Sequence, residues 1–301
     1  MTWTPPQLVR WIAEDLKQKG FDPPHRFQAE MLVSHALKLS RLELYLQHDK
    51  PCTAAEQERL RELIKRRYRY EPIAYILGTA DFWSLSLKVG PGVLIPRQET
   101  EVLVETALEL IPDDHPSTGY QILELGTGSA AIPLAFCSSR THLSITATEF
   151  SAEALAYARH NRMQYEHLLA ERSNRLVLVQ MDRFSAIHPE TKANLIISNP
   201  PYIPDHQLRT LQRDVSEWEP LSALEGGKTG IDFYQYLFQA AIDTLTPNGY
   251  LVVEHGFDQA ENLTRLIKEI DGLGLVKRQK DYSGHDRVLV IQKRQSAGPT
   301  L

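Results

Sequence analysis

Asn199, Pro200, Pro201 and Tyr202 follow one another one residue after the apolar run Leu195–Ile197, with Ser198 between. The Asn199 side-chain oxygen and the Pro200 backbone carbonyl are two neighbouring hydrogen-bond acceptors. The two prolines restrict the backbone, so these acceptors are held in place before a substrate binds. Tyr202 offers a flat apolar face on which a planar group can pack. The four residues are the predicted catalytic residues, and their chemistry is the capture of a planar group that donates hydrogen bonds.

A glycine-containing run lies earlier in the chain, between a predicted strand and a predicted helix. Glycine lets the backbone turn sharply and approach a ligand, and a helix N-terminus offers unpaired N–H groups to a negative group. Ala131 stands where a dinucleotide fingerprint would have its third glycine. The run instead resembles the first motif of the class I S-adenosylmethionine (SAM) methyltransferases, although that family usually has glycine at the position of Ala130. The predicted cofactor-binding residues of this run are Gly126, Thr127, Gly128, Ser129 and Ala130.

Acidic residues follow the next two predicted strands. Glu149 comes about 20 residues after the glycine run, where a carboxylate can accept hydrogen bonds from both ribose hydroxyls of a nucleoside. Asp182 stands where the same family contacts the edge of the adenine. An aromatic residue often stacks on the adenine at the position of Arg183, so the contact is left open between Arg183 and Phe184. Glu149, Asp182 and Arg183 complete the predicted cofactor site, to which Asn199 is also assigned.

The tetrapeptide Asn199–Tyr202 also resembles the motif of methyltransferases that act on a nitrogen bonded to a planar π-system, either adenine N6 or an amide. At average residue usage it occurs by chance about once in a thousand chains of this length. The resemblance implies that the acceptors on Asn199 and Pro200 fix the NH₂ group while it becomes pyramidal. No residue is assigned as a general base, because a sulfonium is a strong methyl donor and the nitrogen can lose its proton late.

The elements that must position these residues follow from hydrophobic periodicity. From Pro5 to about Arg69 the spacing is helical, with helices predicted at 8–19, 26–39 and 54–67. Phe82–Val89 alternates apolar and polar residues and is followed by Gly90–Gly92, which indicates a hairpin between two domains. From Glu99 on, strands and helices alternate. Strands are predicted at 121–125, 143–148, 176–180, 194–197, 250–254 and 288–292, and helices at 101–110, 130–137, 152–165, 234–245 and 259–270.

This alternation indicates a mostly parallel sheet covered on both faces. Ligands bind outside the carboxyl ends of the strands in such sheets, which is where the residues above fall. The predicted fold is α/β, a Rossmann-like class I SAM-dependent methyltransferase with a small all-helical N-terminal domain and a β-hairpin linker. The predicted boundaries are 1–78 for the helical domain, 79–98 for the linker, 99–295 for the methyltransferase domain and 296–301 for a tail.

Composition excludes several classes of protein. The chain has 301 residues, of which 42% are hydrophobic and 24% charged, enough to bury a substantial core. No stretch has the roughly 18 to 20 apolar residues of a membrane helix, and the first helix is charged unlike a signal sequence, so a cytoplasmic location is expected. A net charge of −5 argues against a broad nucleic-acid surface. Cys52 and Cys137 show no metal-ligand or CxxC spacing, so no metal site is predicted.

Further motifs extend the resemblance over nearly the whole chain. Glu71–Gly78, Phe82-Trp83, Leu94–Arg97, Glu99–Glu101 and the run Val252, Glu254, His255 and Gly256 are similar to the HemK/PrmC family. That family comprises the N5-glutamine methyltransferases of class-1 peptide chain release factors, and Gln98 stands where it commonly has proline. The resemblance implies SAM as cofactor and the glutamine of a Gly-Gly-Gln motif as methyl acceptor. It also implies a class-1 release factor as partner, docked on the helical domain. From the composition, neither a membrane nor stable nucleic-acid binding is expected.

Two other functions remain open at this level. An adenine-N6 methyltransferase acting on DNA or RNA would share the Asn199–Tyr202 motif, with the basic run Lys65–Arg69 as its support in the sequence. Such a run is more often the solvated end of a helix. A SAM-binding sensor or assembly factor without catalysis is the third possibility, and the intact Asn199 argues against it.

Overall fold

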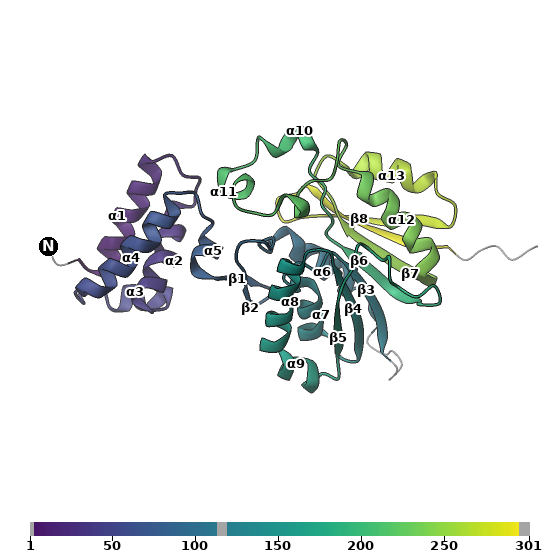
Figure 1. Ribbon diagram of the computed structural model, residues 1–301, viewed down its shortest axis with the longest axis horizontal. Coiled ribbons are helices and arrows are strands. Elements are labelled where there is room, and N and C mark those ends of the chain that lie inside the picture. Colours follow the sequence, from purple (N-terminus) through teal and green to yellow (C-terminus); the bar gives the residue numbers. More distant parts are fainter. Residues whose placement is uncertain (1–2, 113–118, 295–301) are drawn as a thin grey trace, which may run out of the picture. The chain divides into compact units, whose positions relative to one another are not determined.

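The computed structural model describes residues 3–112 and 119–294, and it divides into two compact units. The first unit takes in the chain up to Thr79 together with Arg213–Trp218. The second takes in Ala80–Gln212 and the chain from Glu219 onward. Figure 1 shows the first unit as helices only and the second as a sheet with helices. The predicted tail at 296–301 lies outside the described residues.

Helices α1 to α5 form most of the described part of the first unit. The helices α1, α2 and α4 confirm the three helices predicted from periodicity. The periodic apolar residues of α1, such as Leu8, Ile12 and Leu16, are buried in the core of this unit. Capping boxes begin α3 at Ser40 and α4 at Thr53. The helices are α1 (Pro5–Gln18), α2 (His25–Leu37), α3 (Arg41–Leu46), α4 (Ala54–Arg67) and α5 (Ile73–Leu77).

The short segment Arg213–Trp218, which contains α11 (Arg213–Ser216), belongs to this helical unit. The Trp218 Nε1–H donates to the backbone oxygen of Arg69 over 3.1 Å. The Arg213 guanidinium lies 3.8 Å from the centre of the Tyr70 ring. Side chains from a distant part of the sequence therefore complete the end of the helical unit.

The basic run at the end of α4 is only partly solvated. Arg67 is 3% exposed, and its Nη2 pairs with Asp214 over 3.4 Å. The same guanidinium donates to Gln28 Oε1 and to the Glu71 backbone oxygen, over 3.0 and 3.1 Å. The prediction of a solvated helix end is therefore wrong at Arg67, because three acceptors repay the loss of water around its charge.

A seven-stranded sheet forms the second unit as the described residues define it, in the order β5-β4-β3-β6-β7-β9-β8. The first five strands of that order are parallel neighbours, whereas β9 is antiparallel to both β7 and β8. The strands are β3 (Tyr120–Leu125), β4 (Leu143–Glu149), β5 (Arg175–Gln180), β6 (Ala193–Ser198), β7 (Leu245–Glu254), β8 (Leu273–Lys280) and β9 (Asp286–Lys293).

Helices cover both faces of the sheet. Alternate residues of β3 point to opposite faces, so Ile122 packs in the core with α6, α7 and α8, whereas Leu123 packs in the core with α12 and α13. The mixed α/β fold and its mostly parallel sheet confirm the predicted class. The described helices of this unit are α6 (Glu99–Leu108), α7 (Ala131–Ser139), α8 (Ala152–Gln164), α9 (Glu166–Glu171), α10 (Asp205–Leu208), the 3₁₀ helix η1 (Leu221–Ala223), α12 (Asp232–Thr244) and α13 (Ala260–Lys268).

The two-stranded sheet differs from the prediction in where its turn lies. Phe82–Val89, taken as one alternating run before a turn at Gly90–Gly92, is split between β1 (Thr79–Phe82) and β2 (Leu85–Lys88). Trp83 and Ser84 form the turn with φ angles of 53° and 62°, the pair of positive values that a two-residue hairpin loop requires. A second difference is β8, which was not predicted.

Candidate active site

A cavity of about 530 Å³ opens at the carboxyl ends of β3, β4 and β6. Between β3 and β6 the strand order reverses direction along the chain, the position at which open α/β sheets bind ligands. Of the residues predicted from sequence, the cavity is lined by Gly126, Thr127, Gly128, Ser129, Glu149, Asp182, Arg183, Asn199 and Pro201. The predicted residues Ala130, Pro200 and Tyr202 lie outside this lining.

The glycine run forms the tight connection from β3 to α7. Gly126 has a φ of 77°, and a Cβ there would meet no protein atom within 4 Å, so it would project into the cavity. The backbone N–H groups of Gly126 and Thr127 both donate to the Thr148 oxygen at 2.9 Å. Ala130 is fully buried at the start of α7 with a φ of 65°. Its methyl group therefore packs inside the protein, and Ala131 takes the place on the cavity wall.

Glu149 is fixed through both of its carboxylate oxygens. Its Oε2 accepts from the Gly128 N–H over 2.8 Å, and its Oε1 accepts from the Ser151 N–H over 2.9 Å. The carboxylate thereby ties the glycine run to the end of β4. Each oxygen keeps a further lone pair for a ligand, so the position suits a group with two neighbouring hydroxyls.

Arg183 and Phe184 separate at the far side of the cavity. The Arg183 guanidinium pairs with Asp182 at 3.2 Å and lies 4.7 Å from the centre of the Tyr236 ring. Phe184 is buried in the core between the sheet and α12, so it does not face the cavity. Phe150, which the sequence reasoning missed, lines the cavity and is 68% exposed. The sequence pattern that could have identified Phe150 is an aromatic residue directly after Glu149, the acid that ends β4.

Asn199 reaches the cavity from the end of β6. Its Nδ2 donates to Thr100 Oγ1 over 3.1 Å, and Thr100 Oγ1 donates to Glu254 Oε2 over 2.7 Å. No residue in 3–112 or 119–294 donates a hydrogen bond to Asn199 Oδ1 or to the Pro200 oxygen. Two acceptors are thus left available at the motif.

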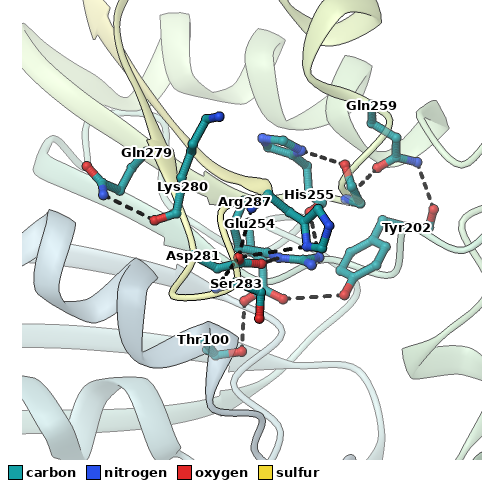
Figure 2. A network of polar contacts seen from close by, with 12 residues as sticks. Thr100, Tyr202, Glu254, His255, Gln259, Gln279, Lys280, Asp281, Ser283 and Arg287 are labelled. Atoms are coloured by element: carbon teal, nitrogen blue, oxygen red, sulfur yellow. Dashed lines mark hydrogen bonds and ion pairs between the residues drawn. The ribbon is translucent and has the colours of Figure 1, made fainter.

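The rest of the motif is held from behind. The Tyr202 hydroxyl donates to Glu254 Oε1 over 3.4 Å, and the Tyr202 backbone oxygen accepts from Gln259 Nε2 over 2.8 Å (Figure 2). Ile203 pairs with the segment around Glu225 in an isolated bridge. The loop is therefore anchored on both sides before a ligand binds.

Two buried carboxyl groups lie beneath the cavity. Burial away from water raises the pKa of Glu124 to about 8, and the charge of Glu149 acts in the same direction. Both Glu124 oxygens and the neighbouring Thr127 Oγ1 are buried without a hydrogen-bond partner among the described residues. Burial likewise raises the pKa of Glu254 to about 7, against the hydrogen bond from Thr100 and the charge of Arg287, which lower it.

An ion pair supports the cavity wall that precedes α6. Arg97 pairs with the buried Glu219, whose Oε2 also accepts from the Ile95 N–H over 3.0 Å. Leu94, Pro96 and Arg97 line the cavity. The run Leu94–Arg97, quoted above only for its resemblance, therefore has a definite place in the site.

Known proteins resemble this chain in both of its parts. Residues 7–78 match the model of the PrmC N-terminal domain, and residues 99–216 match that of the methyltransferase small domain. The release factor glutamine methyltransferase of Geobacter sulfurreducens is 38% identical over 95% of this chain and 96% of its own length. The enzyme of the same name from Coxiella burnetii is 37% identical over 89% of this chain and 92% of its own. This chain belongs to the release factor glutamine methyltransferase family.

Solved structures agree on the fold of this family member. The hMettl16 catalytic domain, crystallised with the MAT2A 3′UTR hairpin 6, superposes with a TM-score of 0.52 over 71% of this chain and 77% of its own. Its 13% identity makes this a likeness of fold alone. The predicted class I methyltransferase fold is confirmed.

Sequence reasoning gave no role in the site to Thr100, Glu254 or Glu219, although Thr100 and Glu254 fall within runs quoted above for their resemblance. Thr100 lines the cavity and bonds Asn199, Glu254 bonds Thr100, and Glu219 bonds Arg97. Within 3–112 and 119–294, His, Cys, Asp and Glu side chains form no group of three that could hold a metal ion. Over the same residues, every helix is too short or too polar to cross a membrane.

Proposed function

We propose that this chain transfers the methyl group of SAM to the side-chain amide nitrogen of the glutamine in the Gly-Gly-Gln motif of a class-1 peptide chain release factor. The observation that carries the proposal is the hydrogen bonding of Asn199. Its NH₂ group is committed to Thr100, which leaves its oxygen as an acceptor at the cavity. Family membership supports the same substrate, and a partner active in translation favours the cytoplasm.

The residues present fit SAM as the cofactor. The cavity has room for a drug-sized ligand, and the absence of a side chain at Gly126 leaves space next to the loop. Glu149 would accept hydrogen bonds from the ribose hydroxyls, and Phe150, Met181 and Asp182 would surround the adenine. Among the residues that line the cavity, Thr127 has a buried hydroxyl without a hydrogen-bond partner in the described part of the chain, so the loop holds a polar group that a ligand could satisfy.

The chain's own residues would act on the glutamine amide. Asn199 Oδ1 and the Pro200 oxygen would each accept one N–H of the NH₂ group, which draws it out of conjugation with its carbonyl. Two prolines keep these acceptors in place, so little entropy is lost when the amide binds. When bound, SAM supplies a methyl group on a positively charged sulfur. The nitrogen would release its proton to water after transfer, so no side-chain base is required.

The helical domain, with boundaries proposed at 1–78, would dock the body of the release factor. Support comes from large apolar side chains that remain exposed on this unit, three of which lie on the short helix α3. They are Trp11, Phe27, Leu42, Tyr45 and Leu46. The linker at 79–98 and the methyltransferase domain at 99–295 complete the proposed organisation.

Label transfer from SAM tests the proposal directly. The full chain is incubated with labelled SAM and either a class-1 release factor or nucleic acid, and the methylated residue is located by mass spectrometry. Label on the Gly-Gly-Gln glutamine is expected, and a release factor with that glutamine replaced is the matched control. Label on adenine would instead identify an adenine-N6 methyltransferase and remove the proposal.

Asn199→Ala tests the division of roles within the site. Methyl transfer is expected to fall by about a hundredfold or more, because one of two acceptors of the NH₂ group is lost. SAM affinity, measured by calorimetry, should stay nearly unchanged. Asn262→Ala, on the exposed side of α13, is the matched control and should keep full activity. An equal loss of SAM affinity and rate in Asn199→Ala would contradict this assignment.

A further inference from the structure

Glu254 occupies a special position relative to the Asn199–Tyr202 motif. It is the last residue of β7, and strand pairing sets Val253 beside Ser198, the last residue of β6. The next residues along the two strands are therefore Glu254 and Asn199. The Glu254 carboxyl group is 1% exposed, so its oxygens must find partners within the protein.

One carboxyl group is linked to both ends of the motif, directly to Tyr202 and through Thr100 to Asn199. Glu254 Oε2 accepts from Thr100 Oγ1 over 2.7 Å, and Thr100 Oγ1 in turn accepts from Asn199 Nδ2 over 3.1 Å. The other oxygen, Oε1, accepts from the Tyr202 hydroxyl over 3.4 Å. Figure 2 shows Thr100 and Tyr202 approaching the carboxyl group of Glu254 from different sides.

The hydrogen bonds in this chain can run in only one direction while Glu254 is ionised. A carboxylate only accepts, and a threonine hydroxyl has a single proton to donate. Thr100 must therefore donate to Glu254, which leaves its oxygen to accept from the NH₂ group of Asn199. The amide oxygen of Asn199 is consequently turned away from Thr100. A reversed amide would present its NH₂ group to the substrate's NH₂ group, and no hydrogen bond could form between them.

We propose that Glu254 is a positioning residue that sets the orientation of the Asn199 amide through Thr100, while it holds Tyr202 at the other end of the motif. This inference rests on the proposed function, since it assigns the orientation that a glutamine NH₂ group needs. Glu254 acts through its neighbours and does not line the cavity.

Protonation of Glu254 would release the constraint. Burial raises its pKa to about 7, so the group changes its protonation state near neutral pH. Protonated Glu254 can donate to Thr100, which frees the threonine proton to turn toward Asn199 and permits the reversed amide. The charged and titratable groups that act on it are Glu99 of α6, Tyr202, Tyr234 of α12 and Arg287 of β9, and Arg97 acts on the neighbouring Tyr202. The rate of methyl transfer should therefore rise with pH through about 7.

Replacements of Thr100 test the proposal while the volume of the side chain is kept nearly the same. Thr100→Val keeps the volume but can neither accept from Asn199 nor donate to Glu254, so kcat for a class-1 release factor should fall by about tenfold. Thr100→Ser restores the hydroxyl and should restore most of kcat. SAM affinity should change little in either variant. Thr106→Val, at a buried position of the same helix outside the cavity lining, is the matched control for loss of a threonine hydroxyl.

Glu254→Gln adds a readout that a merely structural role would not move. Glutamine keeps the size but does not ionise, so the rise of kcat between pH 6 and 8 should disappear in this variant. Equal kcat in Thr100→Val and the natural chain, or an unchanged pH profile in Glu254→Gln, would overturn the positioning role. If Glu254→Gln does not fold, the kcat values of Thr100→Val and Thr100→Ser still test the positioning role. A natural chain that leaves the release factor unmethylated would instead remove the proposed function, and this inference with it.

Discussion

Glu124 is a buried acid whose ionisation opposes folding. Burial raises its pKa from the ordinary value of 4.5 to about 8. Because the folded state holds this proton more tightly than the unfolded chain does, the stabilisation is complete below about pH 4.5 and is lost as pH rises through 8. At pH 9 the folded protein carries an ionised carboxylate without a hydrogen-bond partner among the described residues.

Glu124→Gln should therefore change stability in a pH-dependent way. Relative to the natural chain, its free energy of unfolding should be higher at pH 9 than at pH 4, at about 1.4 kcal/mol per unit of pKa shift. Urea unfolding of both proteins at the two pH values measures the difference. A gap that stays the same at both pH values would show that Glu124 does not titrate in this range.

Residues that directly follow a strand could be predicted from the sequence, and residues that support them could not. Gly126, Glu149 and Asn199 come at strand ends in the chain order, so a local pattern marks each of them. Thr100 and Glu254 lie 154 residues apart and meet only because β7 pairs with β6 and α6 packs near their ends. Only the sheet order brings them together, and no property of the separate segments reveals that order.

At the scale of elements, the motif loop depends on a close backbone approach. A Cβ on Gly226 would lie 2.8 Å from the Tyr202 Cα, nearer than real Cβ contacts allow. The Gly226 N–H donates to the Ile203 oxygen over 2.8 Å, so the two segments cannot separate without losing that bond.

Gly226→Ala should consequently displace the loop that carries Asn199. We expect the rate of methyl transfer to fall by about tenfold or more, because small misplacements of reacting groups are costly. Steady-state assays with a release factor measure this. Gly284→Ala is the control, since a Cβ there meets no atom within 4 Å and strains only its own turn at a φ of 86°. Equal activity of the two variants would exclude a special role for the close approach.

The elements that sequence reasoning missed lack a local signal for physical reasons. The edge strand β8 carries Lys277, Arg278 and Lys280, and its residues after Gly274 are only partly buried or exposed. Charged side chains on an edge protect it from pairing with other chains, and they hide its strand pattern. At the hairpin turn, Trp83 and Ser84 have positive φ angles, which glycine or asparagine adopts more readily. Hydrogen bonds from Trp83 to Glu101 and to Ser139, at 2.9 and 2.8 Å, stabilise this turn.

At the scale of the whole molecule, the helical unit depends on a distant part of the chain. Arg67 is the central residue of this dependence, since it bonds Gln28 and Glu71 as well as Asp214. Burial lowers the pKa of Arg67, and the charge of Asp214 partly offsets that effect.

Arg67→Ala should therefore loosen two separate stretches of sequence together. Loss of a buried, multiply bonded charge leaves its partners unpaired and should cost about 3 to 5 kcal/mol of stability. Hydrogen exchange measured by mass spectrometry should accelerate in α2 and in Arg213–Trp218 alike. Arg61→Ala, at an exposed position of the same helix, is the control. Faster exchange in α2 alone would show that Arg213–Trp218 folds independently of the helices.

The polypeptide passes between the two units three times, at 79–80, 212–213 and 218–219. A gene shortened by its first 79 codons would still encode six amino acids whose partners are gone, among them Trp218 and Asp214. Modular exchange of the N-terminal part between relatives thus requires matched changes within the second half of the gene. The helical unit and the second half of the gene must therefore change together at the six codons for Arg213–Trp218.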